Sequence, residues 1–272
     1  MLSELVAGAV ADASERRAIR PLEQVEADAI ARPAALDVLA ALSPSERVKI
    51  IAEVKRASPS RGPLADIVDP ASLAVSYQTG GASAISVLTE RRRFHGSLAD
   101  LEAVRAAVDV PVLRKDFIAE PYQVFEARAA GADLVLLIVA ALQQPVLAEL
   151  HELISQLGMT ALVETHSADE VERALDVGAS VVGVNARDLS TFELDRELFG
   201  SLADRIPSGV VRIAESAVTE PADVAHYRAA GADVVLVGEA LVTGGDPVAM
   251  LESFRNASPA HPVGPRATKV TA

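Results

Sequence analysis

Lysine is scarce in this 272-residue chain, which contains 21 arginines but only four lysines. Two of the four, Lys55 and Lys115, stand at the ends of short apolar segments. An arginine side chain keeps its proton at any usable pH, whereas burial tunes a lysine ammonium to donate and accept one. We therefore expect Lys55 and Lys115 to transfer protons or to present a compact positive charge to a ligand.

Three carboxylates and an amide occupy equivalent positions at the ends of apolar segments. They are Glu53, Glu164, Glu215 and Asn185, and Ser216 follows the third glutamate directly. Carboxylates beside ammonium groups stay ionised, act as bases and lower the cost of burying lysines. A metal would also use three glutamates, but no histidine joins them at ligand spacing and the lysines would repel a cation. The prediction is acid–base chemistry without a metal or any other cofactor.

Eight short runs rich in β-branched residues recur along the chain, separated by amphipathic segments long enough for crossover helices. They cover 48–54, 84–88, 111–113, 134–139, 160–163, 181–184, 211–214 and 234–237. The runs are apolar throughout, as strands buried on both faces are, and RAAGAD occurs twice, at 128–133 and 228–233. A doubly wound open sheet is the alternative, but no G-x-G-x-x-G follows the first run. We predict the α/β class and a single (β/α)8 TIM barrel.

The flanks of the barrel give three predicted parts: a helical extension at 1–47 packed on the barrel, the barrel at 48–255, and a disordered tail at 256–272. Helical patterns at 2–16 and 36–42 are interrupted by Pro21 and Pro33. The tail has three prolines, one glycine and no acidic residue.

Reacting groups in such a barrel lie where the strands end and lead into helices. Glu53 and Lys55 are two residues apart and therefore point to the same side. For any one of these residues, a solvated strand end in a surface salt bridge is an equally good explanation. Two lysines, three glutamates and an asparagine at one rim together favour a site.

Phosphate binding is predicted for the loops after the last two strands, at 215–217 and 237–239, because main-chain N–H groups and helix dipoles gather there. The predicted phosphate ligands are Ser58, Arg187, Ala217, Gly238 and Glu239. Three of the nine aromatic residues, Phe94, Phe117 and Phe192, follow strand ends. They favour an apolar wall for a planar substrate, although loop phenylalanines often only pack locally.

Composition excludes several classes of protein. The chain has no cysteine, which rules out disulfides, thiolate metal sites and thiol nucleophiles. A net charge of −13 argues against nucleic acid or an anionic membrane as the main partner. The longest apolar run, 134–142, is too short to span a bilayer, and the N-terminus lacks the basic segment of a signal peptide. We expect a cytoplasmic monomer that binds a small phosphorylated substrate.

Six motifs together resemble the indole-3-glycerol phosphate synthase family, the ring-closing enzymes of tryptophan biosynthesis. They are IAEVKRASPSRG at 51–62, VLTERRRFHGS at 87–97, PVLRKDFI at 111–118, ALVETH at 161–166, GVNARDLSTF at 183–192 and IAES at 213–216. They occur in order over about residues 1–255. The resemblance implies that 1-(2-carboxyphenylamino)-1-deoxyribulose 5-phosphate is converted to indole-3-glycerol phosphate with loss of CO2 and water.

The resemblance also implies roles for single residues. Lys115 would be the general acid at the substrate ketone, and Lys55 would pair with the anthranilate carboxylate and share proton transfer with Glu53. Glu164 would assist dehydration as acid or base. The remaining implied contacts are Asn185, Glu215 and Ser216 to the hydroxyls, Ser58 and Arg187 to the phosphate, and Phe94, Phe117, Leu136 and Leu189 around the aryl ring.

One position departs from the family pattern, which usually reads Glu-Ser-Gly where this chain has Ala217. If that position needs a positive φ, an alanine there costs about 1 kcal/mol or more. Two other functions remain open at this point. Another phosphate-binding barrel such as phosphoribosylanthranilate isomerase would call for a cysteine base, which is absent, and a non-catalytic barrel would need only ordinary strand-end charges.

Overall fold

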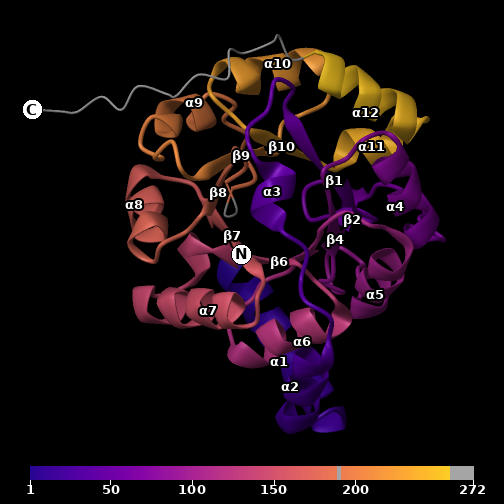
Figure 1. The fold of residues 1–272 in the computed structure, drawn as a ribbon, viewed down its shortest axis with the longest axis vertical. Coiled ribbons are helices and arrows are strands. Elements are labelled where there is room, and N and C mark those ends of the chain that lie inside the picture. The colour runs from indigo at the N-terminus through magenta and orange to yellow at the C-terminus, as the bar shows by residue number, and fades with distance from the viewer. Residues whose placement is uncertain (189–190, 258–272) are drawn as a thin grey trace, which may run out of the picture.

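The computed structural model describes residues 1–188 and 191–257, and within them eight parallel strands close into a barrel (Figure 1). In barrel order these are β1 (Lys49–Val54), β10 (Val234–Val237), β9 (Val211–Glu215), β8 (Val181–Asn185), β7 (Thr160–Thr165), β6 (Leu134–Ile138), β5 (Val112–Lys115) and β4 (Ala84–Leu88). Strand β1 closes the ring because Ile51 is paired with Ala84 on one side and with Leu236 on the other. The predicted TIM barrel is confirmed.

Helices follow the strands and surround the barrel in Figure 1. They are α4 (Pro70–Thr79), α5 (Leu98–Ala107), α6 (Pro121–Ala130), α7 (Gln144–Gln156), α8 (Ala168–Asp176), α9 (Leu198–Ala203), α10 (Pro221–Ala229), α11 (Glu239–Thr243) and α12 (Pro247–Asn256), with a 3-10 turn η1 (Val139–Ala141). A small hairpin of β2 (Ala57–Ser58) and β3 (Gly62–Pro63) follows β1 and was not predicted. Residues 258–272 of the predicted tail lie outside the described residues.

Three helices precede β1: α1 (Leu2–Ile19), α2 (Leu22–Ala31) and α3 (Val38–Leu42). The sequence patterns predicted the first and third but missed α2. The reason is Pro21, which we interpreted as an interruption although it caps the start of α2. Proline is well suited to a helix start because its missing N–H would have no partner there and its φ is already near the helical value.

The N-terminal extension contacts both ends of the barrel. Helix α1 lies at the end where the strands finish, because its first turns share a cavity with the loops after β4 and β8. The segment around α3 lies at the opposite end, where Leu36 N donates to the Asp133 carboxylate just before β6. Both copies of the RAAGAD repeat hold this segment, since Arg128 donates to Pro33 O and Arg228 donates to Ser45 O.

Apolar side chains fill two concentric layers. One packs the outer faces of the strands against the surrounding helices, and the other fills the inside of the barrel. The inner layer includes Leu113, Leu136 and Leu162, and Leu5 of α1 and Leu42 of α3 join it from the extension. Since the interior is packed rather than hollow, polar groups have room only at the rims.

Candidate active site

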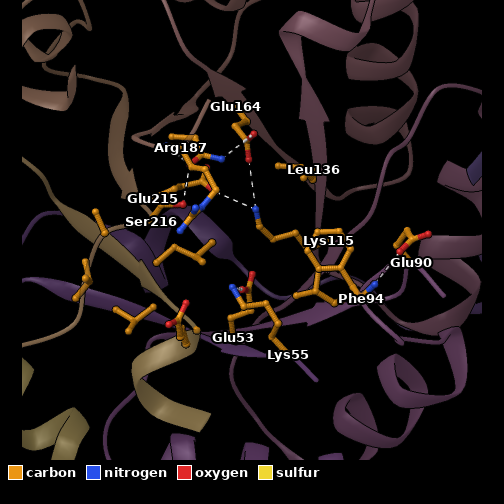
Figure 2. Close-up of a pocket in the computed structure, with 18 of the residues that line it drawn as sticks. Glu53, Lys55, Glu90, Phe94, Lys115, Leu136, Glu164, Arg187, Glu215 and Ser216 are labelled. Carbon is orange, nitrogen blue, oxygen red and sulfur yellow. Dashed lines mark hydrogen bonds and ion pairs between the residues drawn. The ribbon is translucent and has the colours of Figure 1, made fainter. Parts of the chain in front are cut away.

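The predicted polar residues come together at the carboxyl ends of five strands (Figure 2). Glu53 lies near the end of β1, Lys115 ends β5, Glu164 is the last residue but one of β7, and Asn185 and Glu215 end β8 and β9. All five line one cavity. The four residues other than Lys115 are each at most 6% exposed, so this rim is not a set of solvated strand ends.

Lys115 is held between two carboxylates. Its Nζ donates to Glu164 Oε2 at 3.3 Å and to Glu215 Oε2 at 3.1 Å. Burial alone would lower the pKa of Lys115, but the charges of Glu215, Glu164 and Glu53 outweigh it and raise that pKa above its usual range. The ammonium therefore remains protonated at neutral pH.

Glu164 is fixed through both of its oxygens. Oε2 accepts from Lys115, and Oε1 accepts from Asn185 Nδ2 at 3.1 Å. Asn185 is oriented in turn, because its Oδ1 accepts from Ser216 Oγ at 2.8 Å and from Arg187 N at 3.0 Å. Burial would raise the pKa of Glu164, but the Lys115 ammonium and His166 outweigh it and lower that pKa below its usual range.

Glu215 differs from Glu164 although both touch the same ammonium. Burial raises the pKa of Glu215 to about 8; Lys115 opposes this shift and Glu164 adds to it. Its Oε1 lies where a Cβ on Gly183 would be only 2.1 Å away, so a glycine on β8 makes room for this carboxyl group. At neutral pH the site therefore holds one ionised and one protonated glutamate around a single ammonium.

Stability should depend on this proton. Because the pKa of Glu215 rises from 4.5 to about 8 on folding, the folded chain binds more protons in this window, and the contribution of Glu215 to stability falls as pH rises through it. Glutamine at position 215 stays neutral, so we expect the stability of Glu215→Gln relative to the natural chain to increase from pH 5 to pH 8. Urea unfolding at several pH values measures this, and a pH-independent difference would contradict it.

A second ion pair faces the same cavity from β1. Lys55 Nζ lies 3.0 Å from Glu53 Oε1, and Ser86 Oγ donates to Glu53 Oε2 at 3.3 Å. Gly238 makes room for this pair, since a Cβ there would lie 2.5 Å from Glu53 Oε1. The two lysines are thus both paired, and each lines the cavity.

An apolar wall borders the polar groups. Phe94 and Phe117 face each other with ring centroids 6.3 Å apart, and Leu136 lines the cavity with them. Phe192 lies elsewhere, in a separate cavity beside α1. Leu189, the fourth residue implied around the aryl ring, lies outside the described residues.

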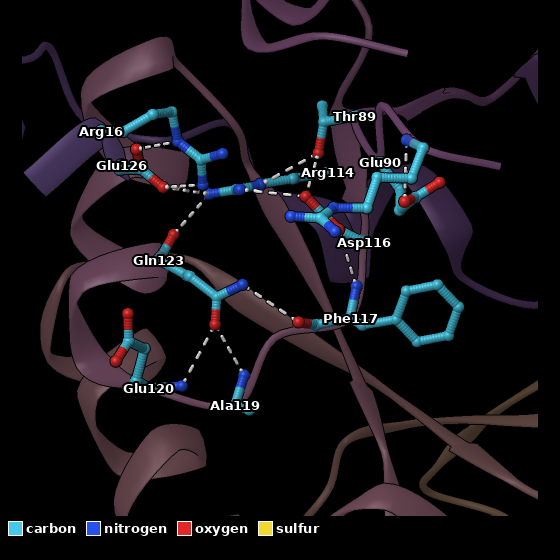
Figure 3. A network of polar contacts seen from close by, with 11 residues as sticks. Arg16, Thr89, Glu90, Arg114, Asp116, Phe117, Ala119, Glu120, Gln123 and Glu126 are labelled. Carbon is cyan, nitrogen blue, oxygen red and sulfur yellow. Dashed lines mark hydrogen bonds and ion pairs between the residues drawn. The ribbon is translucent and has the colours of Figure 1, made fainter. Parts of the chain in front are cut away.

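The wall is tied to the rest of the chain by a polar network (Figure 3). The Glu90 carboxylate accepts from the Phe94 main-chain N–H at 2.9 Å, and Asp116 accepts from Phe117 N at 2.9 Å. Asp116 also binds the fully buried Arg114 at 3.0 Å. Sequence reasoning missed Glu90 and Asp116, because these partners are loop main-chain atoms whose positions follow only from the folded loops.

Four of the five predicted phosphate ligands line the cavity: Arg187, Ala217, Gly238 and Glu239. Ser58 belongs to the β2–β3 hairpin and is not among the lining residues; its Oγ lies 3.5 Å from Ser60 Oγ. Arg61 lines the cavity instead, with Nη2 3.2 Å from Glu239 Oε1. Sequence reasoning missed Arg61 because the hairpin that presents it was not predicted.

Ala217 has a φ of 58°, in the left-handed region that a glycine adopts without strain. Holding an alanine in this conformation costs about 1 kcal/mol of free energy. The loop should therefore depart from this conformation more readily than a loop with glycine at position 217 would. We expect Ala217→Gly to bind the phosphorylated substrate more tightly, with KM lower by up to about fivefold, which corresponds to ~1 kcal/mol. Steady-state kinetics provide the measurement, and an unchanged KM would count against a phosphate contact at this N–H.

In the described residues, no three His, Asp or Glu side chains are placed to hold a metal ion together. No described helix is both long enough and apolar enough to cross a bilayer.

Comparison with known proteins adds independent information. A family model described as indole-3-glycerol phosphate synthase matches residues 2–254. A protein of that name from Leifsonia xyli is 73% identical over 255 residues, covering 94% of this chain and 98% of the relative. One from Mycolicibacterium vanbaalenii is 58% identical over 266 residues, covering 98% and 97%.

Solved structures support the fold alone. A 3-hexulose-6-phosphate synthase superposes with a TM-score of 0.62 at 20% identity, over 78% of this chain and all of the other. An N-acetylmannosamine-6-phosphate 2-epimerase from Clostridium perfringens superposes with a TM-score of 0.60 at 16% identity, over 83% and 98%.

Proposed function

The chain belongs to the indole-3-glycerol phosphate synthase family and is a carboxy-lyase of that family, and from this premise we propose how its residues carry out the reaction. The proposed substrate is 1-(2-carboxyphenylamino)-1-deoxyribulose 5-phosphate, which closes to indole-3-glycerol phosphate with loss of CO2 and water. The observation that carries the proposal is the contact of Lys115 Nζ with both Glu164 and Glu215 inside the cavity.

Substrate orientation follows from the two kinds of lining. The aryl ring lies against Phe94, Phe117 and Leu136, and the phosphate lies beside Arg187 and the main-chain N–H groups of the loops at 215–217 and 237–239. In this orientation the anthranilate carboxylate faces Lys55, whose positive charge complements it.

Ring closure needs a proton at the ketone oxygen while the aryl carbon that bears the carboxylate attacks the ketone carbon. Lys115 donates this proton, because its neighbours keep it protonated until the substrate arrives. The carbon–carbon bond forms and the ketone oxygen becomes a hydroxyl. Loss of CO2 then returns the bonding electrons to the ring.

Dehydration removes that hydroxyl as water and a proton from the neighbouring carbon. Glu164, which Asn185 holds in position, assists this step as acid or base; in its ionised form it is the base that takes the proton from the neighbouring carbon. Asn185, Glu215 and Ser216 orient the hydroxyls, and Glu215 does so as a hydrogen-bond donor while it is protonated. The pair of Glu53 and Lys55 shares the remaining proton transfers.

The direct test is to incubate the purified protein with the carboxyphenylamino substrate and to follow the fluorescence of the indole product. Product formation is expected, and its absence at micromolar enzyme would overturn the proposal. Phosphoribosylanthranilate serves as the second substrate, because turnover of that compound alone would favour the isomerase alternative. The monomeric state and the cytoplasmic location remain predictions from the sequence.

A further inference from the structure

His166 is a partly buried residue beside the proposed site that the mechanism above does not use. It follows β7, two residues after Glu164, and its side chain is 13% exposed. Its Nε2 lies 3.4 Å from Glu164 Oε1, and its Nδ1 lies 3.2 Å from Glu170 Oε2. The ring therefore bridges a carboxylate of the site and a carboxylate outside it.

Glu170 is held independently of this contact. It lies in the first turn of α8, and its Oε2 accepts from the His166 main-chain N–H at 2.8 Å. Helix α8 is capped by Ser167, whose Oγ accepts from Glu170 N at 3.3 Å. Since a carboxylate in the first helical turn is also favoured by the helix dipole, Glu170 is a fixed anion for the ring to bind.

The charges alternate along a line into the site: Glu170, His166, Glu164 and Lys115. The imidazole is a charged neighbour of Glu164 Oε1 at 3.4 Å, whereas the hydrogen-bond donor to that oxygen is the neutral amide of Asn185. A nearly fully buried carboxylate with less compensating charge takes up a proton more readily, because burial disfavours its charged form.

We propose that His166 is a positioning residue for the reaction: as an imidazolium between Glu164 and Glu170, it keeps Glu164 ionised and turned toward Lys115. The inference rests on the proposed function, because it assigns Glu164 its part in the acid–base steps.

The surroundings support a cationic ring. Burial alone would lower the pKa of His166, but contact with Glu164 and Glu170 outweighs it and raises that pKa to about 10. Glu164 faces the ring from β7 and Glu170 from α8, and the cation Lys115 lies on the far oxygen of Glu164. Arg173 of α8 is directed elsewhere, to the Val139 and Leu142 carbonyls. The ring thus stays charged throughout the neutral range.

The first test is the pH profile of His166→Gln. Glutamine offers amide N–H donors but no charge, so the pKa of Glu164 should rise, and the acid limb of kcat should move up by about one to three pH units. KM should change little, because the ring lines no part of the cavity. The matched control is Asp169→Asn, which removes an exposed carboxylate from the same helix turn and should leave the profile unchanged. An unshifted acid limb in His166→Gln would overturn the proposal.

The second test measures the ring directly, in the full chain without substrate, by NMR of 15N-labelled histidine. His166 should stay protonated to about pH 10, while His151, whose pKa burial lowers, should titrate below its ordinary value of 6.5. In Glu170→Gln the pH at the midpoint of the His166 titration should fall. This variant tests the proposal even if His166→Gln does not fold. A titration midpoint near pH 6.5 for His166 in the natural chain would contradict the proposal that its ring is an imidazolium. If the natural chain forms no indole product, both the proposed function and the positioning role of His166 are wrong. The NMR titration still determines whether the His166 ring is charged.

Discussion

Replacing Lys115 with arginine is expected to lower kcat for indole formation by about 10² to 10⁴-fold, the range that a lost general acid costs. Arginine keeps the positive charge between Glu164 and Glu215, so electrostatic attraction to the carboxylates is retained. Its guanidinium does not release a proton at usable pH, however, and its planar fork is wider than an ammonium. The variant therefore separates proton donation from charge.

A matched control comes from the other end of the barrel. Lys49 begins β1 near the amino ends of the strands, so Lys49→Arg is the same chemical change away from the cavity. Its kcat should equal that of the natural chain. Single-turnover measurements of indole fluorescence compare the two variants, and near-native turnover by Lys115→Arg would remove the general-acid role from this residue.

The barrel could be predicted from the sequence because parallel strands buried on both faces leave uninterrupted apolar runs. The third run shows the limit of this signal. Its apolar residues span 111–113, whereas β5 is Val112–Lys115, because Arg114 and Lys115 are polar but continue the strand. Arg114 is fully buried there and donates to Thr89, Asp116 and the main-chain carbonyl of Gln123, and these partners all lie outside the apolar runs.

Much of the candidate site could also be placed from the sequence, because one rule puts strand-end residues at one rim. That rule positions Glu53, Lys115 and Asn185, whose backbone lies in the strands themselves. It says nothing of loop residues. Arg61 reaches the cavity on an unpredicted hairpin, and His166, in the turn after β7, lies between Glu164 and Glu170 of the next helix.

The second large effect is expected at Glu53. In Glu53→Gln the ammonium of Lys55 loses the carboxylate that lies 3.0 Å from it. The buried side chain at position 53 then has no carboxylate that could accept a proton. If the pair shares the proton transfers that follow ring closure, kcat should fall by about 10² to 10⁴-fold with the fold intact. The gap that Gly238 leaves for Oε1 fits the amide as well as the carboxylate, so packing alone should not lower the rate.

Two products separate the steps that Glu53 serves. Release of CO2 measures ring closure and decarboxylation, and indole fluorescence measures dehydration. If both rates fall, Glu53 acts in a step before CO2 is lost. If only the fluorescence rate falls, Glu53 acts in the dehydration step. Ser86→Ala is the matched control, because it removes the 3.3 Å hydrogen bond to Glu53 Oε2 but leaves the carboxylate charge beside Lys55. Its rate should stay within about tenfold of the natural chain, since a typical hydrogen bond contributes ~1 kcal/mol and this one is long at 3.3 Å. Native rates of both products in Glu53→Gln would show that Lys55 and Lys115 transfer the protons without this carboxylate.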